Sequence, residues 1–189
     1  MELALRFATG GEAELEEAIA LYGEKLVRYA ASVLYSHQDA EDVVQDVFLY
    51  AYRNRHRFDG KNLQAWLYKI AYNDCLDKLK SKKRRKLFFL FDISEEPTTY
   101  MDDIESISEI DEALHRLKPN ERALLYGRIV DGQNYDELSR IMGVSPSTLR
   151  KQYERIKKKA ARYLNDCGYG VKYEPLYAIN SKGGQFYDA

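Results

Sequence analysis

The sequence predicts an all-α fold with two small helical domains, an acidic linker between them and a helix-turn-helix in the second domain. Apolar residues recur at helical spacing in both flanking parts of the chain, while the alternation typical of strands is scarce. Two clusters of Lys and Arg are separated by a stretch from Asp92 to Glu112 that contains neither residue. The first basic cluster consists of Lys78, Lys80, Lys82, Lys83, Arg84, Arg85 and Lys86, and the second of Arg150, Lys151, Arg155, Lys157, Lys158, Lys159 and Arg162. A length of 189 residues suits one ordinary domain or two small ones, and this charge pattern favours a chain in three parts.

The predicted bounds are 1–86 for the first domain, 87–107 for the linker, 108–167 for the second domain and 168–189 for a C-terminal extension. The apolar run 87–91 would be an aggregation hazard if exposed, so we expect it to pack on the first domain. Docking into a partner is the alternative. The extension is a disordered tail, a packed segment or a regulatory arm; its glycines and terminal position favour the first.

Four helices are predicted in the first domain, over 12–21, 23–34, 39–55 and 63–83. The third opens with Asp39, Glu41 and Asp42, whose charges complement the positive end of the helix dipole. Its apolar side is formed by Val43, Val44, Val47, Phe48 and Ala51. The fourth helix has Trp66 and Ile70 as core residues, and the apolar pattern of all four is typical of a bundle.

Four further helices are predicted after the linker, over 108–117, 120–131, 135–142 and 146–166, with breaks at Pro119, Gly132 and Gly143. Asn134 can cap the helix that follows it, and Glu137 lies three residues on, where its carboxylate can accept from the amide of the cap residue. Ser145 followed by Pro146 is typical of a helix start. The turn over 143–145 therefore joins two helices.

These two helices have the pattern of a helix-turn-helix. Core spacing is shown by Leu138, Ile141, Met142, Val144, Leu149, Tyr153 and Ile156, with Ser139 where the helices approach closely. The outward face of the second helix bears Ser147, Thr148, Arg150, Lys151 and Glu154, which would read base edges in the major groove. Farther along, Arg155, Lys157, Lys158, Lys159 and Arg162 would neutralise phosphates. A helical hairpin with a solvated basic face is the alternative, but cap, turn and charge together favour DNA binding.

The helix over 39–55 has a second face that is unusual for a solvated surface. Helical spacing places Asp42, Gln45, Asp46, Leu49 and Arg53 on one stripe. Acids, an amide and an exposed leucine together are typical of a protein–protein contact. A plain solvated face is the alternative.

Aromatic and basic residues alternate from Phe58 to Asn73. The loop and the following helix contain Phe58, Lys61, Asn62, Tyr68, Lys69, Tyr72 and Asn73, and Lys80 follows in the first basic cluster. Aromatic rings stack on unpaired bases and lysines balance phosphates, so this segment is a candidate surface for single-stranded DNA. The alternative, which the sequence leaves equally open, is that Tyr68 and Tyr72 only cover the core.

Composition excludes several other classes of protein. The formal net charge of -1 is an average over segregated acidic and basic segments, so it does not argue against DNA binding. Cys75 and Cys167 are far apart, and the three histidines lack ligand spacing, so neither a metal site nor a cofactor is expected. The chain has no apolar stretch of membrane-spanning length and no signal-peptide order at its start, which predicts a cytoplasmic protein.

Two motifs together resemble the extracytoplasmic-function group of RNA polymerase sigma factors. Residues 39–48, Asp-Ala-Glu-Asp-Val-Val-Gln-Asp-Val-Phe, look like the family's helix that binds the clamp coiled coil of the largest polymerase subunit. Residues 66–73, Trp-Leu-Tyr-Lys-Ile-Ala-Tyr-Asn, resemble its promoter-melting and minus-ten segment, and 58–62 its base-capturing loop. Residues 117–122 and 135–149 are similar to its minus-thirty-five region.

The resemblance covers about 11–164 and implies a non-enzymatic factor that binds core polymerase and opens promoters, serving a stress- or envelope-responsive set of genes. It also implies that an anti-sigma protein is a candidate partner. Lys151-Gln152 departs from the family, where many members have a small residue and then Arg, so a phosphate contact there is in doubt. A helix-turn-helix regulator that binds duplex DNA without polymerase is the first rival. A nucleic-acid enzyme ranks last, because no histidine or carboxylate cluster accompanies a nucleophile and no phosphate-binding glycine loop is present.

Overall fold

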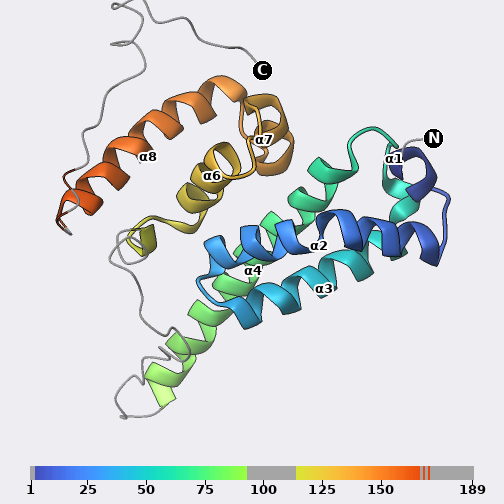
Figure 1. The fold of residues 1–189 in the computed structure, drawn as a ribbon. Coiled ribbons are helices and arrows are strands. Elements are labelled where there is room, and N and C mark those ends of the chain that lie inside the picture. Colours follow the sequence, from blue (N-terminus) through green and yellow to red (C-terminus); the bar gives the residue numbers. More distant parts are fainter. Residues whose placement is uncertain (1–2, 93–113, 167, 169, 171–189) are drawn as a thin grey trace, which may run out of the picture.

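Seven α-helices and a short 3-10 helix form the described part of this computed structural model, which comprises residues 3–92, 114–166, 168 and 170 and omits the side chains of 86–92. In order they are α1 Leu3–Phe7, α2 Glu12–Leu34, α3 His37–Arg53, η1 Arg55–Arg57, α4 Leu63–Asp92, α6 Pro119–Ile129, α7 Tyr135–Met142 and α8 Pro146–Asp166 (Figure 1). No strand occurs among the described residues, and the all-α prediction is confirmed. None of these helices is both long and apolar enough to cross a membrane.

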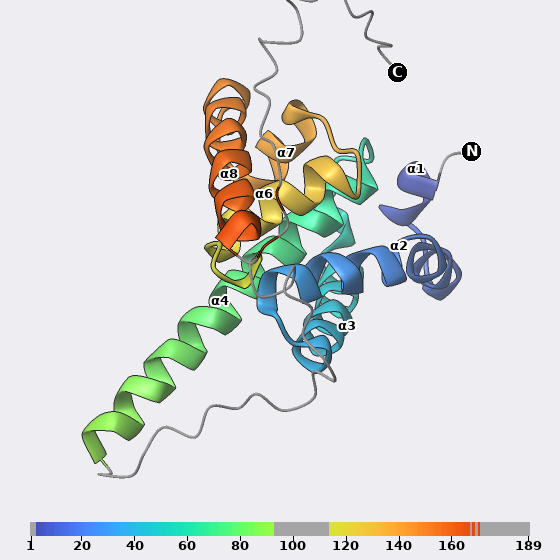
Figure 2. The same cartoon turned by 60° about the vertical axis from the view of Figure 1, so that its left-hand side comes forward.

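The first three long helices, α2, α3 and α4, pack side by side around one apolar core, and α1 covers one end of it (Figure 1). Leu26, Val33, Val47 and Leu67 are completely buried there, which confirms the apolar faces that the sequence predicts. The carboxyl-terminal part of α4 projects beyond the bundle (Figure 2).

Several predicted boundaries in this domain are wrong. Helix α2 is continuous where two helices were predicted, and α1 was not predicted at all. Helix α3 begins at His37 because Ser36 provides its cap, with the Ser36 hydroxyl accepting from the Asp39 amide at 3.2 Å. It ends two residues earlier than predicted, and α4 continues to Asp92 instead of 83.

The second domain contains α6, α7 and α8. The predictions of 135–142 and 146–166 match α7 and α8 at both ends, and α6 replaces the predicted 120–131. Leu117, Leu124, Leu138 and Leu149 form most of its core. The predicted helix over 108–117 falls largely outside the described residues, as do the linker and most of the extension; the side chains of the apolar run 87–91 are likewise not described.

The two helical domains are in contact, which the sequence did not predict. Helix α6 lies against α2, and α7 lies against α4 (Figure 2). Ala123 of α6 is fully buried and Ile141 of α7 nearly so, in the same apolar cluster as the core of the first domain. The domain bounds themselves remain a prediction, since most of the predicted linker lies outside the described residues and its first part, 87–92, continues α4.

Candidate nucleic-acid and partner interface

The start of α7 is held by a capping box. The side-chain oxygen of Asn134 accepts from the amides of Asp136 and Glu137 at 3.0 and 2.9 Å, and the Glu137 carboxylate accepts from the Asn134 amide at 2.8 Å. These bonds satisfy backbone donors that an eight-residue helix would otherwise leave open. The predicted cap is therefore confirmed.

The turn between α7 and α8 also follows the prediction. Gly143 ends α7 with φ of 69°, a left-handed conformation that an L side chain adopts only with strain. The Ser145 hydroxyl then accepts from the Thr148 amide at 3.3 Å and so caps α8. Leu138, Leu149 and Ile156 are buried in one apolar cluster that holds the helix-turn-helix together, while Ile141 is buried against the first domain.

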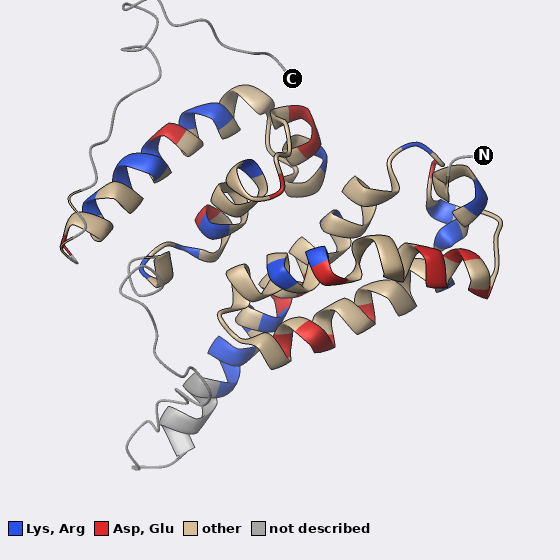
Figure 3. Cartoon of the chain, viewed as in Figure 1, with Lys and Arg blue, Asp and Glu red and all other residues tan. Residues whose placement is uncertain are grey.

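Most of the predicted base-reading and phosphate-binding residues lie on the exposed face of α8. The exposed ones are Ser147, Thr148, Arg150, Lys151, Arg155, Lys158 and Arg162. Glu154 is only half-buried and forms an ion pair with Lys157 at 2.8 Å, so part of its charge is already neutralised. Figure 3 shows basic residues spaced along the length of α8.

Arg150 contacts Tyr135, a residue that was not predicted to belong to the DNA-binding site. Its guanidinium carbon lies 5.2 Å from the centre of the Tyr135 ring, at the start of α7. Arg128 of α6 lies over the same ring at 4.7 Å. A guanidinium at this distance from an aromatic face is attracted to it, so Tyr135 limits the orientations available to Arg150. The spacing of residues 135 and 150 in the sequence gives no sign of this contact.

Fewer cations of the second basic cluster are available to bind DNA than the sequence suggests. Lys159 forms an ion pair with Glu121 of α6 at 2.6 Å. Burial alone would raise the pKa of Glu121, but hydrogen bonds from Lys159 and from the Lys118 amide lower it overall. Lys159 therefore joins α8 to α6 instead of facing outward.

The predicted stripe on α3 is exposed along its length. Asp42, Gln45, Asp46, Leu49 and Arg53 all lie on the solvent side, and Leu49 is 49% exposed. Tyr50, which the prediction did not include, is 46% exposed beside it. Figure 3 colours several acidic positions along the ribbon of this helix. The face is thus available to a partner with basic and apolar groups.

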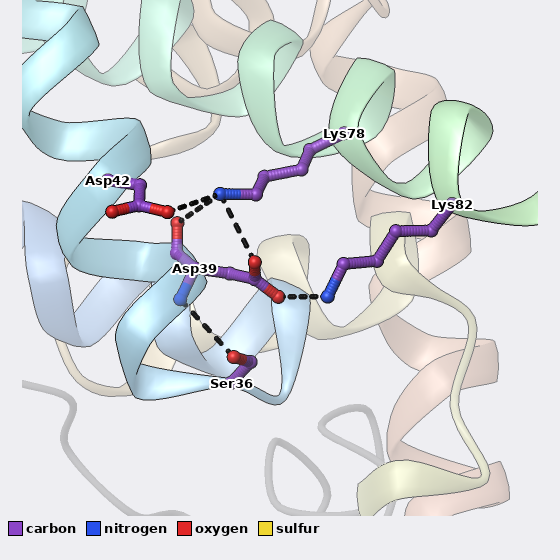
Figure 4. A network of polar contacts seen from close by, with 5 residues as sticks. All are labelled: Ser36, Asp39, Asp42, Lys78 and Lys82. Carbon is purple, nitrogen blue, oxygen red and sulfur yellow. Dashed lines mark hydrogen bonds and ion pairs between the residues drawn. The ribbon is translucent and has the colours of Figure 1, made fainter. Parts of the chain in front are cut away.

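The amino-terminal end of α3 is tied to α4 by a network of charges (Figure 4). Lys78 lies 3.1 Å from the Asp39 carboxylate and 3.0 Å from that of Asp42, and Lys82 bonds the other Asp39 oxygen. Burial alone would raise the pKa of Asp39, but its bonds to the two lysines and to Ser36 lower it overall. Lys80 also pairs with Asp77 at 2.8 Å, so three residues of the first basic cluster are partnered by acids.

The segment between Phe58 and Lys80 divides into buried and exposed residues. Lys61, Lys69, Asn73 and Lys80 are exposed. Phe58 is buried and stacks on Trp66, with ring centres 5.1 Å apart. Asn62 caps α4 by accepting from the Ala65 amide at 2.8 Å, a structural role that the sequence reasoning missed although Asn before a helix is its usual signal.

Tyr68 and Tyr72 do not line an open surface in this structure. Tyr68 is completely buried against Tyr29, with ring centres 4.9 Å apart, and Tyr72 is 8% exposed. Burial raises the pKa of both phenols. In this structure both rings belong to the core of the first domain.

Two models of known protein families match separate segments of the chain. The family model for sigma-70 region 2 matches residues 18–85, and the model for sigma-70 region 4 matches residues 107–159. Together they span more than half of the chain. No group of three or more His, Cys, Asp or Glu residues suited to a metal occurs in the part of the chain that the structure describes.

Two relatives are similar to this chain over most of its length. The ECF RNA polymerase sigma factor SigM of Mycobacterium tuberculosis is 26% identical over 182 residues, covering 90% of this chain and 87% of that one. SigM of Bacillus subtilis is 25% identical, covering 80% of this chain and 98% of its own. Among solved structures, the sigma factor RpoE in complex with the anti-sigma factor NepR from Bartonella quintana is similar in fold, with a TM-score of 0.65, 23% identity and coverage of 79% and 96%.

Proposed function

Because the chain belongs to the sigma-70 family, and within it to the extracytoplasmic-function group, we propose that it binds core RNA polymerase and directs promoter recognition and DNA opening. The observation that carries this conclusion is the match of the region 2 and region 4 models, in that order, on one chain. A helix-turn-helix alone would not distinguish a sigma factor from other DNA-binding proteins.

The exposed stripe on α3 is the proposed contact with polymerase. Asp42, Gln45, Asp46, Leu49 and Arg53 combine charge with an apolar side chain that water covers in the free protein. Burying Leu49 against the clamp coiled coil would add affinity, while the acids would select a basic partner and speed the encounter.

The amino-terminal half of α8 is the proposed reader of the minus-thirty-five element. Ser147, Thr148, Arg150 and Lys151 are exposed at the end of α8 that a helix-turn-helix places in the major groove. Arg150, oriented by Tyr135, is suited to a bidentate contact with guanine. Arg155 and Lys158 would contact phosphates farther along the helix.

The minus-ten side of the promoter is assigned to the exposed Lys61, Lys69, Asn73 and Lys80. Phe58, Tyr68 and Tyr72 belong to the same proposed surface but are buried in this structure, so they would contribute only after they become accessible. Binding unpaired bases better than duplex would favour strand separation without nucleotide hydrolysis. Two weak DNA contacts on one polymerase-bound chain would reinforce each other.

The remaining expectations belong to the same proposal. They are domain bounds of 1–86, 87–107, 108–167 and 168–189, an acidic linker directed to the polymerase, a cytoplasmic location, and a stress- or envelope-responsive set of promoters. An anti-sigma partner would regulate release, although no described residue identifies its site.

Transcription with purified components tests the proposal. The chain added to core polymerase should start transcripts at a defined class of promoters on genomic DNA, as mapped by sequencing of transcript 5′ ends. Asp46→Lys reverses a charge on the α3 stripe and should lower transcription and polymerase binding by at least about tenfold. Glu16→Lys, at an exposed position on α2, is the matched control and should leave both unchanged.

Two results would overturn the proposal. The first is that no transcripts start in the presence of core polymerase while the isolated chain binds duplex DNA strongly. This result would support a helix-turn-helix regulator that acts without polymerase. Equal loss of activity in Asp46→Lys and Glu16→Lys would remove the assignment of the α3 stripe.

A further inference from the structure

Helix α1 is the part of the first domain to which the proposed function gives no role. It lies next to the connection between α3 and α4, which includes the loop 58–62 (Figure 1). It also lies outside residues 18–85, the segment that the family model for region 2 matches. We propose that α1 forms one wall of the site where this loop receives an unpaired base of DNA, and that Leu5 is the residue of α1 that contacts the base. This inference rests on the proposed function, because it adds a residue to the proposed minus-ten surface.

Helix α1 is held on the bundle by most of its side chains. Three of its five residues are buried, and they are Leu3, Ala4 and Phe7. A fourth, Arg6, pairs with α2, where one of its terminal nitrogens donates to both carboxylate oxygens of Glu17 at 2.9 and 2.6 Å. The fifth is Leu5, which is 57% exposed and is among the most exposed large apolar side chains of the described residues. Water therefore covers an apolar group on a short helix whose position is otherwise fixed.

A column of three aromatic rings connects α1 to the loop. The Phe7 ring meets the Trp66 ring of α4 edge-on, with ring centres 6.4 Å apart. Trp66 in turn stacks on Phe58, the first residue of the loop, with ring centres 5.1 Å apart. Aromatic pairs of this kind favour defined ring orientations, so they fix the start of the loop relative to α1. Phe7 is only 1% exposed and thus positions the loop without reaching its surface.

Leu5 lies against the middle of the same loop. Gly60 has a φ of 77°, which an L side chain adopts only with strain. A Cβ atom at Gly60 would lie 3.4 Å from a methyl carbon of Leu5. The loop backbone and the leucine therefore approach each other with no side chain of residue 60 between them. A flat base held by this loop would rest one face against Leu5, as extruded bases do on apolar side chains in other proteins.

The charges around the loop favour a strand of DNA as the ligand. Arg57 precedes the loop and Lys61 lies within it, and both side chains are exposed. Among the described residues neither of them forms an ion pair, whereas Lys78 and Lys82 of the first basic cluster are held by acids. The carboxylate of the loop itself, Asp59, accepts from the Lys61 amide at 3.1 Å. Two exposed cations in and next to the loop, beside an apolar wall, suit the phosphates that flank an unpaired base.

Leu5→Ser removes the apolar wall and leaves every charge in place. It should weaken the binding of a single-stranded DNA 12-mer of mixed sequence by about fivefold, because covering the exposed half of a leucine contributes about that much. Fluorescence anisotropy of a fluorescein-labelled 12-mer titrated with the full chain measures the affinity. Leu21→Ser removes a leucine of α2 that is 51% exposed and is the matched control, expected to change the affinity by less than about twofold.

Two further measurements separate contact with a base from a loss of structure. Leu5→Phe offers an aromatic ring in place of the leucine, so it should bind the same 12-mer about threefold more tightly than the natural chain does. An abasic 12-mer retains the phosphates but offers no base, so its affinity should be equal, within about twofold, for the natural chain and for Leu5→Ser.

Three results would overturn the inference and leave the proposed sigma function standing. They are equal weakening by Leu5→Ser and Leu21→Ser, equal weakening by Leu5→Ser for the abasic 12-mer and the 12-mer with bases, and binding by Leu5→Phe no tighter than by Leu5→Ser. A natural chain that binds the abasic 12-mer as tightly as the 12-mer with bases would instead overturn base capture by region 2, and the inference with it. None of these titrations contains polymerase, so their results are independent of the transcription experiment.

Discussion

Asp39 shows how one carboxylate fixes the position of a functional helix. It lies near the start of α3, where the helix dipole favours an acid, and its two oxygens bond Lys78 and Lys82 of α4. Asp39 thereby positions the exposed stripe of α3, the proposed polymerase contact, relative to α4, which bears part of the proposed minus-ten surface. Because its pKa is lowered in the folded protein, the group contributes stability above its ordinary pKa of 3.8 and loses that contribution as the pH falls through the lower folded value.

Asp39→Asn tests this assignment. The variant should lower the free energy of unfolding by about 1 kcal/mol at pH 7, and the difference from the natural chain should shrink as the pH falls below about 4. Urea unfolding followed by circular dichroism at pH 7 and pH 3 measures both. Glu41→Gln removes an exposed acid near the same helix end and should change stability by less than about 0.5 kcal/mol. A similar loss in both variants would assign the effect to the dipole and not to the lysines.

Helix α2 shows how packing overrides a local preference. Gly23 lies inside the helix, where it is less favourable than Ala by about 1 kcal/mol, and the sequence predicts two helices meeting at this point. Ala18, Leu26 and Tyr29 on either side are completely buried against the neighbouring helices. Burying such side chains stabilises by about 1.5–3 kcal/mol each for the larger ones, which outweighs the glycine.

Gly23→Ala should therefore stabilise the chain by about 0.5–1 kcal/mol. A Cβ at this position would meet only ordinary contacts, the nearest being a methyl carbon of Ile19 at 3.7 Å. The same change at Gly143 should have the opposite sign and destabilise by about 1 kcal/mol, because its φ of 69° disfavours a side chain. Thermal unfolding of the two variants compares them directly, and a destabilised Gly23→Ala would contradict the packing argument.

In the folded molecule, acidic and basic residues gather on different surfaces, and these surfaces do not simply follow the charged segments of the sequence. The chain has a formal net charge of -1, yet the outer side of α8 is basic and that of α3 is acidic (Figure 3). Folding also pairs part of each basic cluster with acids, as Lys78 and Lys159 show. The number of cations available to DNA is therefore smaller than the sequence suggests.

Salt dependence distinguishes the two kinds of cation. Arg155→Gln removes an exposed charge from α8 and should weaken duplex binding while lowering the slope of log affinity against log salt by about 0.9. Lys159→Gln removes an equal charge from the same helix but one already paired with Glu121, so its slope should change much less. Titrations of a labelled promoter duplex with the polymerase-bound factor at several salt concentrations measure both. Equal slopes would mean that Lys159 contacts phosphate despite its partner.

Local interactions explain what the sequence determined by itself. The helix-turn-helix was predicted to the residue because its cap, turn glycine and second cap act over two to four positions, and neighbours in sequence remain neighbours in any fold. The exposed stripe of α3 and the exposed face of α8 follow from helical periodicity for the same reason. Their roles in polymerase and DNA binding stay predictions.

Tertiary structure alone decided which partners distant residues find. Asp39 reaches Lys82, Tyr135 braces Arg150, and Arg122 reaches the end of α2, and none of these contacts follows from spacing along the chain. The burial of Tyr68 likewise depends on Tyr29 and on region 4. Such contacts form only when helices pack at particular angles, and those angles are set by the sum of many side-chain contacts instead of by any local motif.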